Sequence, residues 1–98
     1  MKINPIRSVM RWIVPIVIGI IITLWAVMLI DPARFNHILG DWGRRLGYLD
    51  FAVERYSRAI HHNANRANSF NARGVARYYQ GLFDSALEDY NRSIELDP

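Results

Sequence analysis

The 98-residue sequence contains no cysteine and only one lysine, Lys2. Without cysteine the chain can form no disulfide, no thiolate nucleophile and no cysteine-bound zinc site. It also has no glycine-rich phosphate loop, no nucleophile elbow and no converging pair of carboxylates. These absences argue against an enzyme, a bound cofactor or a small-molecule substrate, so we expect no catalytic residues.

The three histidines do not have the spacing of a metal site. His61 and His62 are adjacent, and adjacent residues of a helix point in different directions. His37 is distant in sequence, and no acidic residue stands at ligand spacing from the pair. We therefore expect no metal ion.

The net charge of +3 comes from the N-terminus alone. Residues 31–98 contain nine arginines and nine acidic residues, so this part is neutral. The excess is Lys2, Arg7 and Arg11, all in the first 11 residues. Basic residues beside an apolar segment are typical of a membrane flank, so we expect a lipid bilayer as a partner and no nucleic acid.

Residues 12–30 form an apolar run without a charged side chain. As a helix, 19 residues extend about 28 Å, close to the thickness of the bilayer hydrocarbon. We predict a transmembrane helix with Trp12 and Trp25 as interfacial anchors and Pro15 in its first turn. The run is longer than the core of a typical signal peptide and no well-framed cleavage site follows it, which favours an uncleaved anchor over a cleaved leader.

Small residues mark one side of this predicted helix. Gly19 and Thr23 are four residues apart and share a face, with Pro15 one turn earlier. Such a face lets a second helix approach closely, although a lipid-facing helix with an incidental glycine fits the same pattern. The two flanks carry equal numbers of Lys and Arg, but those on the N-terminal side are closer. We therefore expect a cytoplasmic N-terminus.

The rest of the chain repeats itself after 34 residues. When residues 33–64 are laid over residues 67–98, nine of 32 positions are identical. A fixed period of this length is typical of stacked supersecondary units. Glycine and aspartate signals with helical apolar spacing predict four helices, at about 32–46, 50–62, 67–80 and 84–96, with Asp31 as the first N-cap.

The second unit resembles the tetratricopeptide repeat. Gly74 matches the small residue where the two helices of a repeat touch, Gly81 matches the turn, and Pro98 matches the closing proline. Phe83, Ala86 and Tyr90 match the aromatic-small-aromatic series of the second helix. The first unit matches through Leu39, Gly40, Gly47, Ala52, Tyr56 and Ala59. Arg73 replaces a common leucine, and we expect it to pair with Asp89 or Glu88 or to remain solvated.

The resemblance implies a non-catalytic protein-interaction module. In this family the first helices of successive repeats line a concave groove that binds peptides or helices. Mapped onto this chain, the groove residues are Arg34, His37, Asp41, Arg44, Arg45, Asn68, Asn71, Val75, Tyr78 and Tyr79. An ordinary solvated helix face is the alternative interpretation.

Two repeats are fewer than the number usually needed to bury a continuous core. We expect an uncovered end formed by Phe83, Leu87, Ile94 and Leu96. A partner protein, self-association or further repeats of a longer array would each cover it.

The sequence thus predicts an all-α chain in four segments: a basic tail (1–11), a transmembrane helix (12–30) and two repeats (31–66 and 67–98). We expect a single-pass scaffold, assembly factor or accessory subunit of a membrane complex. The arginine-rich composition is associated with GC-rich bacterial genomes. In a bacterium, a cytoplasmic N-terminus puts the repeats in the periplasm beside the inner membrane. The alternative is a receptor for targeting peptides with cytosolic repeats.

Overall fold

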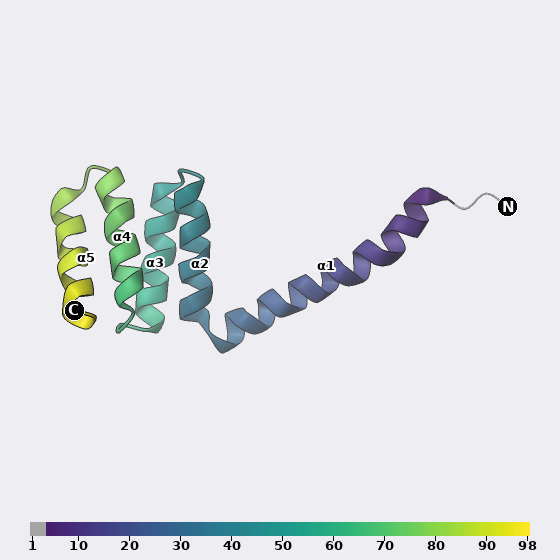
Figure 1. Ribbon diagram of the computed structural model, residues 1–98, viewed down its shortest axis with the longest axis horizontal. Coiled ribbons are helices and arrows are strands. Elements are labelled where there is room, and N and C mark those ends of the chain that lie inside the picture. Colours follow the sequence, from purple (N-terminus) through teal and green to yellow (C-terminus); the bar gives the residue numbers. More distant parts are fainter. Residues whose placement is uncertain (1–3) are drawn as a thin grey trace. The chain divides into compact units, whose positions relative to one another are not determined.

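The computed structural model describes residues 4–98. This range contains five α-helices and no strand (Figure 1). The chain divides into two compact units, one ending at Ile30 and one spanning Asp31–Pro98. The prediction of an all-α chain with a long apolar helix followed by helical repeats is confirmed.

The first unit contains helix α1, Pro5–Ile30, which has no buried residue. It is long and apolar enough to cross a membrane, and a signal sequence near an N-terminus has the same properties. The helix begins seven residues before the predicted start, so Arg7 and Arg11 are helical, while Lys2 lies outside the described residues. Pro15 is therefore in the helix interior, and the prediction that it lies in the first turn is wrong.

The second unit begins with a well-formed helix start. Asp31 is the N-cap of α2, Pro32–Arg45, and its Oδ1 accepts a hydrogen bond from the backbone N–H of Arg34 at 2.9 Å. Pro32 occupies the first helical position. A backbone N–H at this position has no acceptor within the helix, so proline loses no hydrogen bond there. The predicted N-cap is confirmed, and Asp31 is the only residue between α1 and α2.

The remaining helices form two antiparallel hairpins. Helix α2 pairs with α3, Leu49–His62, and α4, Ala67–Tyr79, pairs with α5, Phe83–Leu96. Figure 1 shows these four helices side by side in chain order. Gly47 and Gly81 end α2 and α4 with φ of 85° and 82°. That left-handed conformation suits glycine, and it closes both helices with the same pair of backbone hydrogen bonds.

Close contact between a glycine and a tyrosine holds each hairpin together. A Cβ added to Gly40 would lie 2.6 Å from Cε1 of Tyr56, and one added to Gly74 would lie 2.9 Å from Cε1 of Tyr90. The absence of a side chain at both glycines therefore lets the aromatic rings pack against the helix backbone. Ala52, Tyr56 and Ala76 form the buried core where the hairpins meet.

Candidate protein-interaction surface

The predicted residues of α4 lie together on one exposed face of that helix. Helical spacing puts them side by side, and each is exposed or half-buried. We call this the α4 face: Asn68, Asn71, Val75, Tyr78 and Tyr79. The rings of Tyr78 and Tyr79 meet edge-on with centroids 5.7 Å apart. The face therefore offers two large aromatic side chains beside two amides.

Three of the five predicted residues of α2 make polar contacts within the unit: His37, Asp41 and Arg44. The hydroxyl of Tyr56 donates to Oδ1 of Asp41 at 2.6 Å and accepts from Nε of Arg44 at 3.2 Å. Nδ1 of His37 lies 3.0 Å from Oγ of Ser69, and its Nε2 lies 3.5 Å from Oδ2 of Asp41. These residues connect α2 to α3 and α4, so their main role in this geometry is to brace the two hairpins.

Burial changes the acid–base properties of this cluster. It raises the pKa of Tyr56 to about 12, helped by the hydrogen bond to Asp41. The same hydrogen-bond system raises the pKa of Arg44. Burial lowers the pKa of His37, although the Asp41 charge acts in the opposite direction. The folded state therefore favours a neutral imidazole beside a protonated phenol.

One predicted residue of α2 and one of α4 line the same surface cleft. Arg44 of α2 and Tyr79 of α4 line an open cleft of about 440 Å³ together with Gly47 and Leu49. The structure thus brings one basic and one aromatic side chain from different repeats to one site. Such a combination is common where proteins bind other proteins.

Arg34 and Arg45 are more exposed than the other predicted residues of α2. Helical spacing puts them between Asp41 on one side and Ile38 and Trp42 on the other. They border a second surface that was not predicted from the sequence.

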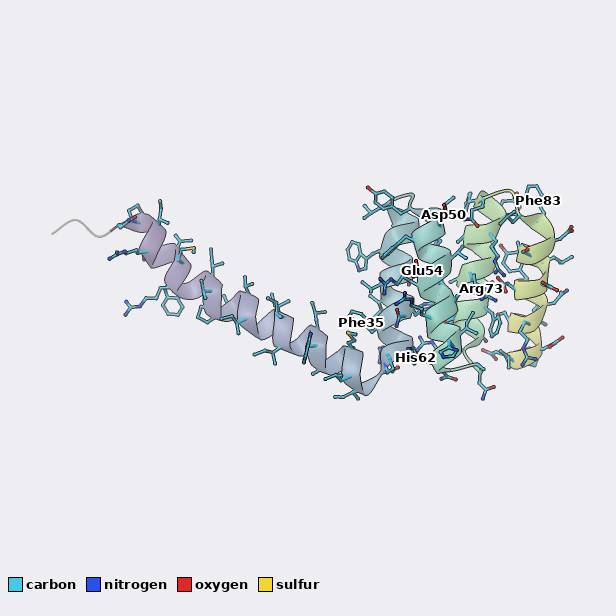
Figure 2. The ribbon with its side chains drawn as sticks, turned by 180° about the vertical axis from the view of Figure 1, so that it is seen from behind. Phe35, Asp50, Glu54, His62, Arg73 and Phe83 are labelled. Atoms are coloured by element: carbon cyan, nitrogen blue, oxygen red, sulfur yellow. The ribbon has the colours of Figure 1, made fainter. Side chains whose placement is uncertain are left out.

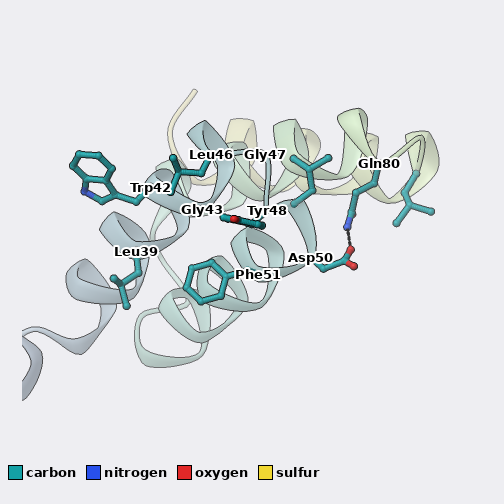
Figure 3. Close-up of a pocket in the computed structure, with 11 residues that line it drawn as sticks. Leu39, Trp42, Gly43, Leu46, Gly47, Tyr48, Asp50, Phe51 and Gln80 are labelled. Atoms are coloured by element: carbon teal, nitrogen blue, oxygen red, sulfur yellow. Dashed lines mark hydrogen bonds between the residues drawn. The ribbon is translucent and has the colours of Figure 1, made fainter.

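This second surface is the outer side of α2. Five apolar side chains there are exposed or half-buried, and we call them the α2 edge: Phe35, Ile38, Leu39, Trp42 and Leu46. Trp42 is 58% exposed and Leu46 is 67% exposed. The edge continues into an open groove of about 1120 Å³ that also involves Phe51 and Leu82 (Figure 3). The 3-4 spacing of its apolar residues was visible in the sequence, but we assigned that helix only to the groove.

The predicted uncovered end lies on α5. Phe83, Leu87 and Ile94 are 61%, 58% and 62% exposed, whereas Leu96 is half-buried. Figure 2 shows Phe35 on α2 and Phe83 on α5, the first and last helices of the unit. The repeat unit therefore has two apolar edges, not one.

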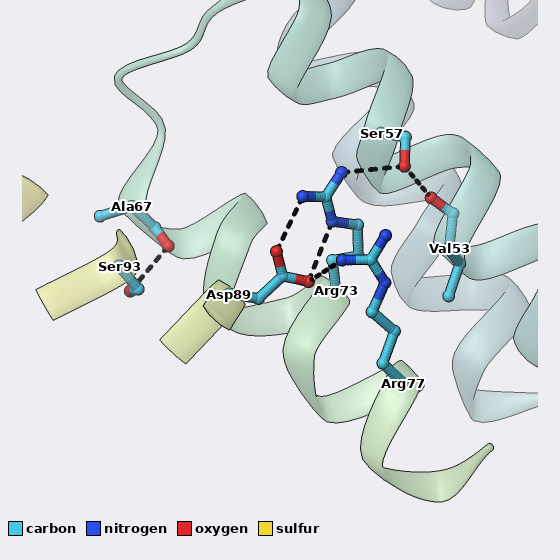
Figure 4. A network of polar contacts seen from close by, with 7 residues as sticks. All are labelled: Val53, Ser57, Ala67, Arg73, Arg77, Asp89 and Ser93. Carbon is cyan, nitrogen blue, oxygen red and sulfur yellow. Dashed lines mark hydrogen bonds and ion pairs between the residues drawn. The ribbon is translucent and has the colours of Figure 1, made fainter. Parts of the chain in front are cut away.

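Arg73 and Asp89 form the polar centre of the second hairpin (Figure 4). The guanidinium group of Arg73 donates two hydrogen bonds to the Asp89 carboxylate, at 3.0 and 2.7 Å, and a third to Oγ of Ser57 at 3.1 Å. Arg77 donates to the same carboxylate at 2.8 Å. The expected pairing of Arg73 with Asp89 is confirmed, whereas neither the second arginine nor the link to α3 was predicted.

The predicted packing face of α1 has its polar group satisfied locally. The hydroxyl of Thr23 donates to the carbonyl of Gly19 at 2.8 Å. A Cβ on Gly19 would meet nothing within 4 Å, and Pro15 lies one turn earlier. This face of α1 therefore consists of small side chains without a free polar group. That it packs against a second transmembrane helix remains a prediction. Among residues 4–98, no three His, Cys, Asp or Glu side chains come together as metal ligands.

The family comparison agrees with this geometry. Residues 67–98 match the sequence model of the tetratricopeptide repeat. Human tetratricopeptide repeat protein 36 is 34% identical over 67 residues, which cover 68% of this chain and 35% of that protein. The chain belongs to the tetratricopeptide repeat family. It spans about a third of the length of this curated relative.

Membership makes protein binding the general role of the repeats. Tetratricopeptide repeats are generally non-enzymatic interaction modules, and they imply protein partners. The α4 face and the two apolar edges are the exposed surfaces of this repeat unit with the residue types that such binding uses.

Proposed function

We propose that this tetratricopeptide repeat protein is a membrane-anchored scaffold, assembly factor or accessory subunit of a membrane complex. The observation that carries the proposal is the apolar, charge-free segment of α1 joined through Asp31 alone to a protein-binding unit. Residues 12–30 span the bilayer as an uncleaved anchor in this proposal, and residues 31–66 and 67–98 act as the binding repeats.

Membrane extraction and intact mass test the anchor. We expect the full chain to stay in the membrane pellet after alkaline carbonate treatment and to keep its N-terminal methionine-to-Arg11 segment. A shortened chain released into the soluble fraction would show that α1 is a cleaved leader, and the anchor proposal would then fail.

The proposed orientation places the N-terminus in the cytoplasm and the repeats in the periplasm of a bacterium. The positive charges of Arg7 and Arg11 at the N-terminal end of α1 support this orientation. A C-terminal alkaline phosphatase fusion should be active and a C-terminal fluorescent protein folded only in the cytoplasm should be dark. The opposite pair of results would favour the receptor with cytosolic repeats.

The α4 face, together with Arg44 in the adjoining cleft, is the proposed partner site. We expect Asn71→Arg and Tyr79→Ala to lose a protein that co-purifies with the full chain in mild detergent. Glu88→Ala, an exposed substitution on α5, is the control that should retain it. If the unmodified chain is purified as a monomer without a partner, the accessory-subunit role is wrong.

A further inference from the structure

The α2 edge differs from the surface by which one repeat stacks on another. Ala72 and Ala76 of α4 pack against α3 inside the chain, and Ala76 is fully buried. The residues 34 positions earlier on α2 are Ile38 and Trp42. An indole in the place of a fully buried alanine cannot reproduce this close packing. The α2 edge is therefore poorly shaped to receive another repeat of the same kind.

The charges around the α2 edge are positive. Arg34 and Arg45 are both exposed beside it, and the guanidinium group of Arg45 lies 6.0 Å from the Trp42 ring. The two acidic groups nearest in sequence are engaged elsewhere: Asp31 caps the helix, and Asp41 accepts the hydroxyl of Tyr56. The edge thus combines an apolar strip with two exposed cationic groups that have no acidic partner among residues 4–98.

The neighbouring helix α3 carries two exposed acids, and both have partners. Asp50 accepts a hydrogen bond from the side chain of Gln80, and Glu54 pairs with Arg58 at 2.8 Å. Figure 2 shows both acids on α3, beside α2. Arg58 therefore offsets the charge of Glu54, whereas Gln80 is neutral and leaves the charge of Asp50 in place at the groove.

Charge also separates between the repeats. Residues 31–66 contain six arginines and four acids, so they carry +2, whereas residues 67–98 contain three arginines and five acids and carry −2. A negatively charged surface would attract the first repeat and repel the second. Of the two apolar edges, the one on α2 is thus the one suited to an anionic partner.

We propose that the α2 edge lies in the headgroup region of the lipid bilayer. The proposal rests on the membrane anchor, because Asp31 alone then separates the transmembrane helix from α2. Trp42, Ile38 and Leu46 enter the boundary between headgroups and acyl chains, where tryptophan is favoured. Arg34 and Arg45 extend to the phosphate groups of anionic lipids.

Tryptophan quenching tests this placement, because the chain has only three tryptophans. Trp12→Phe with Trp25→Phe leaves Trp42 as the single reporter. The full chain is reconstituted into phosphatidylcholine–phosphatidylglycerol vesicles that contain lipids brominated at shallow or deep positions. We expect blue-shifted Trp42 emission that shallow bromines quench more than deep ones. Solvent-like, unquenched emission overturns the proposal, and so does blue-shifted emission without quenching, which would show a protein covering the edge.

A matched control lies on the other edge. Leu87 is 58% exposed, the same as Trp42. Leu87→Trp in a chain whose three natural tryptophans are replaced by phenylalanine should give unquenched emission. Equal quenching at both positions overturns the assignment to the α2 edge.

Two further variants test the membrane anchor and the two arginines separately. A chain with Trp25 alone should be quenched by the brominated lipids; if neither shallow nor deep bromines quench it, the anchor and this inference both fail. If Trp25 is quenched and Trp42 is not, only this inference fails. Arg34→Gln with Arg45→Gln should reduce Trp42 quenching in the anionic vesicles, and unchanged quenching would overturn the role of the two arginines.

Discussion

The two repeats have the same backbone but different polar interiors. In the first, the fully buried Tyr56 binds Asp41 and Arg44 through its hydroxyl. In the second, the buried carboxylate of Asp89 holds two arginines. Asp89 occupies the position 34 residues after Arg55, so the charge at this position is reversed between the repeats.

The residues that both repeats share form the hairpin itself, and the polar residues that differ contact the neighbouring helices. A glycine facing a tyrosine occurs in both repeats and sets the close approach of the helices. The polar groups differ because their surroundings differ: Tyr56 is covered by α4, whereas Tyr90 is half-buried and no helix among residues 4–98 follows α5. The repeated positions therefore define the fold, and the unrepeated ones adapt each hairpin to its place in the array.

Removing the Asp89 carboxylate of the second repeat should change stability the most. Asp89→Asn leaves Arg73 and Arg77 largely buried without a counter-charge, which should lower the free energy of unfolding by about 3 kcal/mol. Urea unfolding of the full chain in detergent, followed by circular dichroism, measures the loss. Glu54→Gln breaks only an exposed ion pair and should change stability by less than about 0.5 kcal/mol. Equal effects of the two substitutions would contradict a structural role for the buried carboxylate.

Adding a methyl group at the helix contact should distinguish a rigid tyrosine from a less buried one. Gly40→Ala should destabilise the chain by about 2 kcal/mol, because Tyr56 is fully buried and hydrogen-bonded and cannot move aside easily. Gly74→Ala should cost less, because Tyr90 is only half-buried; the gain in helix propensity of about 1 kcal/mol is the same for both substitutions. Unfolding midpoints of the two variants give the comparison. A larger loss for Gly74→Ala would show that the Tyr90 ring is just as constrained.

Deleting one hydroxyl should affect the first repeat more than the second. Tyr56→Phe removes bonds to Asp41 and Arg44 and should cost about 1 kcal/mol near neutral pH. Tyr90→Phe is the control, because the Tyr90 hydroxyl has no hydrogen-bond partner within residues 4–98.

The Tyr56 contribution should also depend on pH. Its folded pKa of about 12 lies above the unfolded value near 10, so its stabilisation is complete below about pH 10 and is lost as the pH rises towards 12. The advantage of the unmodified chain over Tyr56→Phe should shrink across this interval in alkaline unfolding curves. A difference that does not change with pH would be evidence against this titration.

Acidification should change the free energy of unfolding the least. The pKa of His37 is lowered on folding, so the unfolded state takes up the proton first and stability is lost as the pH falls below about 6.5. Replacing His37 by Gln should flatten the stability profile between neutral pH and about pH 5. A His37→Gln variant whose stability falls with pH in the same way as that of the unmodified chain would exclude His37 as the cause.

The sequence predicted the fold well because periodic signals carry it. The 34-residue period and the glycines at 47 and 81 defined the hairpins, since each reflects a local backbone requirement. The interior position of Pro15 was missed because the polar start of α1 interrupts the apolar run but not the helix.

The surfaces were harder to predict than the hairpins. The sequence grouped Arg34 and Arg45 with Asp41, but only the structure shows that Asp41 is used internally and that the two arginines border another face. The α2 edge was missed for a similar reason. A 3-4 apolar pattern indicates that a helix has an apolar face, but it does not say whether another helix covers that face.

Asp31 alone connects α1 to the repeats, and this short linker limits how far the start of α2 can move from the end of α1. A linker of one residue spans at most about 3.6 Å, whereas a flexible linker of 20 residues has a root-mean-square length of about 25 Å. The start of α2 must therefore stay within one residue of the end of α1. A binding partner held close to that point meets the repeats at a high local concentration, and one held tens of ångströms away cannot be reached by extending the linker.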